Sequence, residues 1–359
     1  MEGESSTWRP PPIRPQPWSG LPADWQPGWG SDSVSAMTDT AWACLDKNAS
    51  VLASMPPYLV GAAPSLDDAW LDNPDPDLYT AWPEFAKQMF WDYQLGEVFV
   101  LATARYASGY PARFHVVPPW AVNVEWYGGR RRYTIGSVDV SPDMLHVRYQ
   151  GTVTDAHGHG PLEAGYLRVV ASDVLTRYAT GLASSGGVPS SVLEHPDELT
   201  ADQSAALQAQ WVAARSSRLG EPAVLSGGVT WKATQVNPTE MALQDLQTFN
   251  ESRIAILLGV PPFLMGLPSG GDSMTYTNGN AIRIDHWESG LKPKAEAVMS
   301  ALSEWLLPRG TAVELNRDEY VRPDPYTRAQ TEAIYLANGV LSIDEVRAYE
   351  RFNSQGVMQ

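Results

Sequence analysis

Two long helical patterns enclose a short insert, and this order of elements constrains the fold more than any other feature of the sequence. Apolar residues that recur every three or four positions lie on one face of a helix. The first helix is predicted at 162–185, with an apolar stripe of Leu167, Val170, Val174, Tyr178 and Leu182. The second is predicted at 238–258, with Leu246, Phe249, Ile256 and Leu257 on one side.

The insert at 186–237 has the pattern of a strand, a helix and a strand. Thr200 and Gln203 form a capping-box pattern at the start of its helix, which is expected to end near Gly220. A strand pair at 222–228 and 229–236 is expected to close the unit. The sequence therefore predicts a compact α/β unit between two long helices.

The residues before this pair predict an α+β region with a mainly antiparallel sheet. One helix begins near Asp32 and ends at Pro56, and a second begins at Trp82 with Pro83 in its first turn. Gly128-Gly129 is the residue pair of a two-residue hairpin. Strands are expected at 97–104, 112–117, 121–127, 131–136 and 144–149. The Pro/Trp-rich residues 1–32 are interpreted as an arm that is either docked on a neighbour or disordered.

The stretch LLGVPPFLMGLPSGGDSMTYTN, from Leu257 to Asn278, joins an apolar run, a double proline and a loop of small residues. Loops that bind phosphate usually lead into a helix with a lysine nearby, and no Lys or Arg occurs between Arg253 and Arg283. We therefore interpret the loop as a contact surface, formed by Ser269, Gly270, Gly271, Asp272, Ser273, Met274 and Thr275. The alternative is an enzyme that uses 259–278 as a lid over a carboxylate site with Asp272 or Asp285. A helix from Asn280 to Leu307 should follow, with a kink at Pro293.

Signatures of catalysis are missing from the sequence. It has no Gly-Lys pair and hence no Walker A loop, and it has neither H-E-x-x-H nor G-x-S-x-G. Asp155, His157 and His159 could bind zinc, but no third His or Cys lies nearby. We expect a surface turn there, with no metal and no other cofactor. The run Arg130–Arg132 is interpreted as a solvated hairpin tip.

Charge and cysteine content limit the partners. The 25 basic and 41 acidic residues give a net charge of −16, whereas proteins that grip nucleic acid usually carry a basic footprint. Tight DNA binding is therefore disfavoured, and transient contact is not. Cys44 is the single cysteine, and its helical pattern predicts a buried residue. We expect a soluble protein of a reducing compartment, since the longest near-apolar run (254–267) is too short for a bilayer and the N-terminal residues lack a signal-peptide pattern.

Several stretches, taken in order, resemble the HK97-type portal proteins of tailed phages. They are WACLDKNASVLASMPPYLV, YQLGEVFVLATARYASGYPARFHVVPPWAVNV, GHGPLEAGYLRVVASDVLTRYATGLASSGGVPSSVLEHPDELT, FNESRIAILLGVPPFLMG with TYTN and LKP after it, and ELNRDEYVRPDPYTRAQTEAIYLANGVLSIDEVRAYE. The resemblance covers residues 34 to 352, and it rests on the ordered set rather than on one motif. The Pro/Trp-rich arm and a short C-terminal region depart from the family pattern.

The resemblance implies an architecture of wing, stem, clip and crown. After the arm (1–32) it implies a wing (33–161), stem helices at 162–185 and 238–258, a small α/β clip (186–237), a segment with tunnel loop, kinked helix and wing strand (259–322), and a helical crown (323–359). Residues 269–275 would then be a tunnel loop that touches DNA. The candidates for stem residues that face the channel are Glu240, Gln244, Asp245, Gln247 and Glu251.

The resemblance also implies a non-enzymatic protein that forms a ring of identical subunits, typically twelve, at one vertex of the capsid. Double-stranded DNA would be packaged and ejected through the ring without sequence specificity. The implied partners are the large terminase, the major capsid protein and scaffold, and later the head–tail adaptor, but no membrane. The ring would be assembled in the host cytoplasm and kept in the virion. A capsid-associated connector or scaffold of different fold is the remaining alternative.

Overall fold

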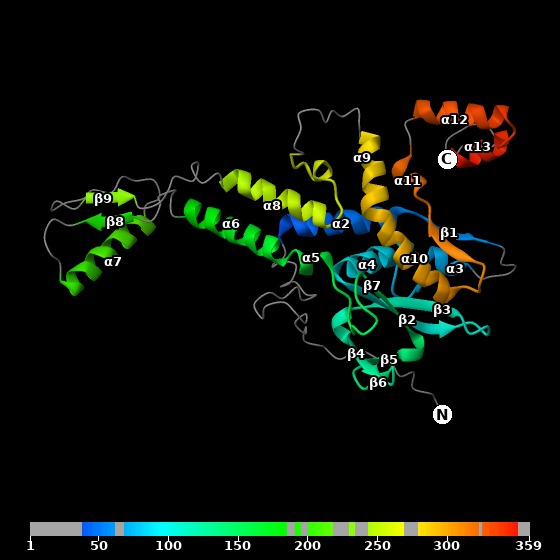
Figure 1. Cartoon of the computed structure of the whole chain (residues 1–359), viewed down its shortest axis with the longest axis horizontal. Coiled ribbons are helices and arrows are strands. Elements are labelled where there is room, and N and C mark those ends of the chain that lie inside the picture. Colours follow the sequence, from blue (N-terminus) through cyan, green and yellow to red (C-terminus); the bar gives the residue numbers. More distant parts are fainter. Residues whose placement is uncertain are drawn as a thin grey trace.

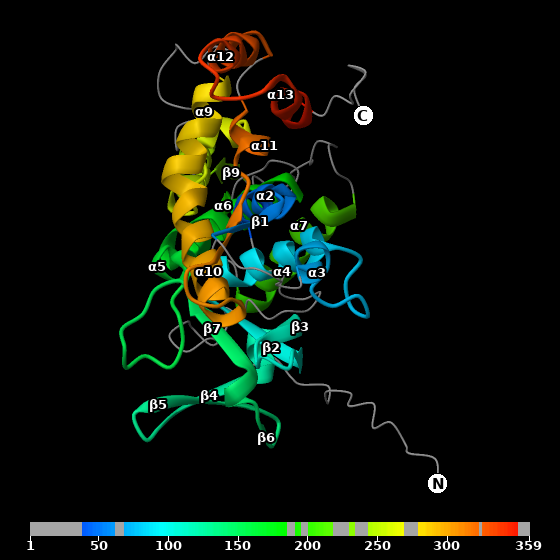
Figure 2. The same ribbon diagram turned by 90° about the vertical axis from the view of Figure 1, so that its right-hand side faces the viewer.

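The computed structural model describes residues 38–61, 68–184, 191–194, 200–217, 230–233, 243–268, 279–322 and 325–350. The predicted arm at 1–32 lies outside these ranges. Figure 1 shows a mixed helix-and-sheet body from which a helix pair projects, with a small unit at the far end of the pair. Figure 2 shows that a helical hairpin and a small sheet lie at opposite ends of the body. No helix of the described part is long and apolar enough to cross a membrane.

Two helices from the first part of the chain and a third, later one contribute most of the core of the body. These are α2 (Asp39–Ser54), α4 (Trp82–Leu95) and α10 (Lys292–Leu306). Thr38 caps α2 through its hydroxyl oxygen, which accepts from the Ala41 amide at 3.3 Å, and Pro83 lies in the first turn of α4 as predicted. The core contains fully buried Leu52, Phe85, Phe90, Phe114 and Leu302. Cys44 is buried, as expected, and burial raises its pKa to about 12.

All strand pairs of the described residues are antiparallel, as predicted. The central sheet has the order β3 (Pro111–Val117), β2 (Glu97–Arg105) and β7 (Met144–Arg148). A second sheet contains β4 (Val122–Tyr127), β5 (Arg130–Ile135) and β6 (Val138–Asp139). The predicted hairpin is confirmed, because Gly128 and Gly129 have φ values of +59° and +79°, which this turn requires at both positions. The strand β1 (Pro57–Val60) pairs with β10 (Ala312–Leu315) from the C-terminal third of the chain.

The projecting pair contains α6 (Tyr166–Ser184) and α8 (Leu243–Leu257). The predicted single helix from Leu162 is divided at Gly165, which follows the short helix α5 (Pro161–Ala164). A side chain at Gly165 would overlap Leu257. The helix pair can therefore approach closely at this point because the residue is glycine.

The predicted apolar faces of this pair are largely exposed in the single chain. The exposed fractions are 79% for Leu167, 57% for Val174, 49% for Leu246, and 52% for both Phe249 and Ile256. Instead Val169 and Ser172 of α6 and Ile254, Ala255 and Leu258 at the end of α8 are buried. Periodicity shows that a helix has an apolar face, but it does not show whether the same chain covers that face.

The unit at the end of the pair is the predicted strand–helix–strand insert. It consists of β8 (Ser191–Glu194), α7 (Ala201–Ser217) and β9 (Thr230–Ala233). The capping box is confirmed, since the Thr200 amide donates to Gln203 Oε1 at 3.0 Å and the Gln203 amide donates to Thr200 Oγ1 at 3.4 Å. The strand β9 pairs with β8, whereas the predicted partner at 222–228 lies outside the described residues.

The long C-terminal helix is interrupted one turn before the predicted kink. It consists of α9 (Gly279–Asp285), a π-helical turn η5 (His286–Leu291) and α10. Pro293 lies in the first turn of α10, where the absence of a backbone N–H costs the helix little hydrogen bonding. The irregular part of the helix is therefore the π turn before Pro293 and not the proline itself.

Short elements complete the chain. They are α3 (Ala69–Asp72), the 3-10 turns η1 (Pro119–Ala121), η2 (Ser141–Asp143) and η3 (Pro262–Met265), and the C-terminal helices α11 (Asp318–Val321), α12 (Pro325–Ala337) and α13 (Ile343–Tyr349). The predicted capping box of α13 is confirmed, because the Ser342 amide donates to Glu345 Oε2 at 2.7 Å and the Glu345 amide donates to Ser342 Oγ at 3.3 Å.

Candidate functional site

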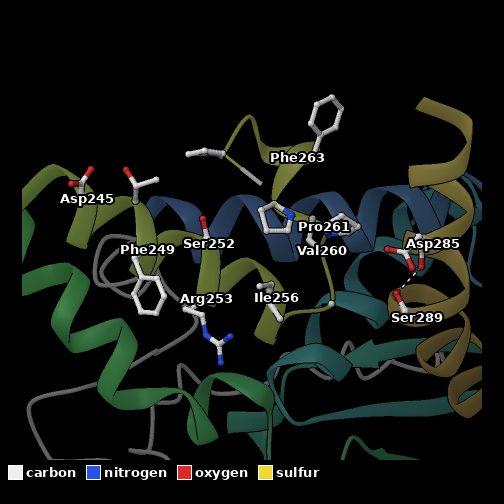
Figure 3. A pocket seen from close by; sticks show the side chains of 14 residues that line it. Asp245, Phe249, Ser252, Arg253, Ile256, Val260, Pro261, Phe263, Asp285 and Ser289 are labelled. Atoms are coloured by element: carbon white, nitrogen blue, oxygen red, sulfur yellow. Dashed lines mark hydrogen bonds between the residues drawn. The ribbon is translucent and has the colours of Figure 1, made fainter. Parts of the chain in front are cut away.

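A groove of about 730 Å³ lies along α8 and the turn that follows it. Its apolar lining includes Phe249, Ile256, Val260, Pro261 and Phe263. Figure 3 shows α2 behind α8, on the side away from the viewer, and α9 with η5 at the other end of the groove. The polar lining includes Asp245, Arg253 and Asp285. This combination suits contact with another apolar surface better than chemistry on a small substrate.

The groove follows from how α8 ends. Gly259 has φ +75°, the Gly259 amide donates to the Ile256 carbonyl at 3.0 Å, and the Val260 amide donates to the Ala255 carbonyl at 2.9 Å. This is the hydrogen-bond pattern of a Schellman cap, which favours glycine in the left-handed position. Pro261 and Pro262 then start η3. The helix thus ends at Leu257 before the double proline is reached, and the two prolines turn the chain to form one wall of the groove.

Gly259 also touches Gly290 of η5. A side chain on Gly290 would overlap the carbonyl oxygen of Gly259. The end of α8 and the π turn therefore meet backbone to backbone. This contact fixes the position of the groove wall relative to α10.

A buried polar network supports the end of α8 from behind the groove. The carbonyl oxygen of Leu258 accepts from Asn48 Nδ2 at 2.9 Å and from Lys294 Nζ at 3.1 Å. Lys294 Nζ also donates to the Gly290 carbonyl at 2.6 Å. The amide of Asn48 is held in turn by Gln94, whose Oε1 accepts from Asn48 Nδ2 at 2.8 Å. Side chains from α2, α4 and α10 thus converge on the last turn of one helix.

His286 extends this network towards the C-terminal helices. Its Nε2 lies 2.9 Å from Asn48 Oδ1, and its Nδ1 lies 2.8 Å from the Tyr320 hydroxyl. Burial and the nearby positive charges of Lys294 and Lys47 lower the pKa of His286 to about 4. The neutral ring is therefore the stable form at pH 7, so Nε2–H donates to the Asn48 carbonyl and Nδ1 accepts from Tyr320. Burial also lowers the pKa of Lys294 to about 8.

The packing between α6 and α8 includes a cation over an aromatic ring. The guanidinium carbon of Arg168 lies 5.6 Å from the ring centroid of Phe249, and Arg168 donates to Asn250 Oδ1 at 3.2 Å. Such contacts fix the orientation of an aromatic side chain that is otherwise half exposed. Phe249 therefore presents a defined surface to the groove.

The predicted channel residues are only partly placed by the structure. Asp245 lines the groove, and Gln247 donates from Nε2 to Glu251 Oε1 at 3.1 Å on the same helix. Gln244 is exposed at the start of α8. Glu240 and the loop residues Ser269, Gly270, Gly271, Asp272, Ser273, Met274 and Thr275 lie outside the described residues. Their contact with DNA stays a prediction.

The loop with Asp155, His157 and His159 has a role that the sequence did not reveal. Buried Glu97 at the start of β2 accepts from the Gly158 amide at 2.9 Å and pairs with His157 Nδ1 and His146 Nε2, each at 2.9 Å. Burial opposes the charge of Glu97, but the hydrogen bonds from the two histidines outweigh it and lower the pKa to about 2. Glu97 thus anchors the loop to the sheet. In the described part of the chain no group of three or more His, Cys, Asp or Glu residues could hold a metal ion.

Two of the three arginines at the hairpin, Arg131 and Arg132, make contacts rather than being simply solvated. Arg131 lies over the Trp126 ring at 5.5 Å and donates to the Val153 and Asp155 carbonyls at 2.8 and 3.1 Å. Arg132 pairs with Asp139 at 2.9 Å. The hairpin therefore uses its basic residues mainly to hold neighbouring segments, although Trp126 itself remains 46% exposed.

Comparison with known proteins places this architecture in a family. A family model described as phage portal protein matches residues 39–350. The probable portal protein of Streptomyces phage phiC31 is 26% identical over 215 residues, which cover 58% of this chain and 47% of the relative. A Rickettsia felis protein is 27% identical over 243 residues, or 62% of each chain. This chain spans between 46% and 62% of the length of the curated relatives that it matches.

Solved structures show the same fold. An HK97 family phage portal protein from Corynebacterium diphtheriae superposes with a TM-score of 0.65 at 14% identity, and the match covers 82% of this chain and 98% of that one. The neck of a native gene transfer agent (GTA) particle, computed with C12 symmetry, gives a TM-score of 0.58 at 19% identity and covers 92% and 95%. These matches leave the alternative of a connector with a different fold without support.

Proposed function

This chain belongs to the phage portal protein family, and from this premise we propose that its copies form a ring at one vertex of a capsid. Double-stranded DNA enters and leaves through the ring. The chain acts as a structural element of the virion and performs no catalysis, while another protein supplies the energy for DNA movement. The ring is proposed to be a homo-oligomer of twelve subunits, in line with the C12 symmetry of the related neck structure.

The observation that carries this proposal is the exposure of apolar faces on the projecting helix pair. Leu167 and Val174 of α6 and Phe249 and Ile256 of α8 are more than half exposed. Soluble monomers rarely leave such stripes uncovered. Covering each exposed side chain contributes on the order of 1 kcal/mol, and a closed ring repeats this gain at every interface. These apolar stripes are therefore assigned to contacts between copies.

The order of elements supports the wing, stem, clip and crown division. The pair α6 and α8 corresponds to the stem, and β8, α7 and β9 at its far end correspond to the clip (Figure 1). We propose that the large terminase and then the head–tail adaptor dock on this far end. The body corresponds to the wing, which faces the major capsid protein and scaffold, and α12 with α13 forms the crown.

The charge of the chain suits DNA that passes without being held. A net charge of −16 gives few cations to neutralise phosphates, and each neutralised phosphate would add to affinity. We propose that residues 269–275 form the tunnel loop at the narrowest contact. The channel-facing stem residues are proposed to be Glu240, Gln244, Asp245, Gln247 and Glu251.

Electron microscopy of the purified chain over a range of concentrations tests the proposal. Closed rings are expected, together with no ATP hydrolysis by the purified protein. In a packaging system with terminase, the chain is expected to be required for DNA uptake. A protein that stays monomeric at every concentration and supports no DNA packaging would refute the proposal, and substrate-dependent activity lost in Asp285→Asn would favour the enzyme alternative.

A further inference from the structure

The helix α8 has two apolar sides, and among the described residues only one of them is buried against another helix. Ile254, Ala255 and Leu258 pack against Ala41, Cys44 and Leu45 of α2. Phe249 and Ile256 lie on the other side and line the groove. Together α2 and α8 form a two-helix layer, with the groove on its α8 side (Figure 3).

The α2 side of this layer presents a large aromatic residue. Trp42 is 39% exposed although it lies next to Ala41, which is completely buried. Its ring packs edge-on against Trp91 of α4 with a centroid distance of 6.1 Å. This contact fixes the indole in place without covering it. Tryptophan held rigidly at a surface is a residue type that dominates protein interfaces.

We propose that the groove of one copy receives the Trp42 side of α2 from the next copy. This inference rests on the proposed ring, because in a cyclic assembly two different faces of the subunit must meet head to tail. The α8 side of the layer is concave and apolar, and the α2 side carries an exposed indole. A groove of about 730 Å³ is large enough for an indole and its neighbours.

Charge at the two faces agrees with this pairing. Arg253 is exposed in the groove, which Asp245 and Asp285 also line. Asp39 is exposed in the first turn of α2, one turn from Trp42, and its carboxylate accepts only the Thr40 amide among the described residues. The interface therefore brings an unpaired carboxylate of one copy towards the guanidinium of the next.

Cysteine cross-linking tests the proposal directly, because the chain has one cysteine and it is buried. In a Cys44→Ala background, Ala43→Cys places a thiol beside Trp42, and Ser252→Cys places one in the groove with little change in size. With a short bismaleimide, the double variant should give a ladder of covalent oligomers. Each single variant should stay monomeric, and an equal mixture of the two should stop at dimers.

The matched control replaces Ser252→Cys by Ser300→Cys, an exposed serine of α10 outside the groove. Ala43→Cys combined with Ser300→Cys should give no ladder. As a second measurement, Trp42→Ala should raise the concentration needed for ring formation roughly tenfold or more, with an unchanged circular dichroism spectrum.

Rings without a ladder from the double variant would overturn this interface and leave the portal proposal standing. If no ring forms under any condition and no ladder appears, both proposals fail. Cross-links between the thiols introduced at positions 43 and 252 of one and the same chain would also overturn the inference. If residues 1–37 or 269–278 of the same chain fill the groove, the ladder of cross-linked oligomers would appear only after that segment is deleted. This result would overturn the inference as well.

Discussion

The ammonium nitrogen of Lys294 lies 3.1 Å from the carbonyl oxygen of Leu258 and is buried without a carboxylate partner among the described residues. It joins α10 to the last turn of α8, and burial lowers its pKa to about 8 from the ordinary 10.5. Between pH 8 and 10.5 the unfolded chain therefore binds the proton and the folded chain does not. Folding stability should rise with pH across this window.

Lys294→Met should abolish that rise. The free energy of unfolding of the natural chain should increase by on the order of 2 kcal/mol relative to the variant between pH 8 and 10.5. Urea denaturation of both proteins at several pH values measures the difference. Lys292→Met, at a partly exposed position whose ammonium pairs with Glu288, is the matched control. Parallel pH profiles of the natural chain and Lys294→Met would contradict the expectation.

Asp92 is a buried carboxyl whose Oδ1 has no hydrogen-bond partner in the described part of the chain. Burial raises its pKa well above the ordinary 3.8, so it costs stability once the pH exceeds the unfolded value. Asp92→Asn should increase the free energy of unfolding at pH 7 by roughly 1–3 kcal/mol. The gain should shrink as the pH falls towards 3.8. A variant that is less stable than the natural chain at pH 7 would refute this explanation.

Glu97 should be essential for the loop that contains His157. Its pKa is lowered to about 2, so its contribution is complete above the unfolded value of 4.5 and is lost as the pH falls towards 2. Glu97→Gln should lower the free energy of unfolding at pH 7 by roughly 2–3 kcal/mol. Hydrogen exchange of the Gly158 amide should accelerate in the same variant. Glu125→Gln, at an exposed position of β4, should change neither quantity.

The proposed tunnel loop gives a functional prediction that is independent of folding. Deletion of residues 269–274 should leave rings visible by electron microscopy, because the stem and wing contacts lie elsewhere. Packaging of DNA, or its retention afterwards, should be impaired. Normal packaging and retention by rings of the deletion variant would show that another segment lines the narrowest part of the channel.

Local chemistry was the part of this fold that the sequence predicted well. Thr200 with Gln203, Gly128 with Gly129 and Pro83 each determine a turn or a helix end through neighbours within a few positions, and all three expectations are confirmed. Contacts between distant residues could not be predicted in this way. Glu97 and His157 are 60 positions apart, and nothing in either local pattern indicates their pairing.

The helix faces show a different limit. Leu167 and Phe249 have the spacing of core residues, and both lie largely in solvent in the single chain. The spacing of apolar residues reflects which side chains are buried in the assembled state. In a ring, some of these side chains are covered by other copies. The groove could not be predicted from the sequence either. Its walls come from α8, η3 and η5, and only the three-dimensional arrangement brings them together.

The backbone contact between Gly259 and Gly290 has a mechanical consequence. Side chains at a joint can change rotamer and so absorb a small displacement, but a joint made of two glycines has no such slack. A pull on the segment after α8 therefore acts directly on the backbone of η5, and His286 connects η5 to Tyr320 of α11. The end of α8 and α11 are thus connected through η5 by direct contacts.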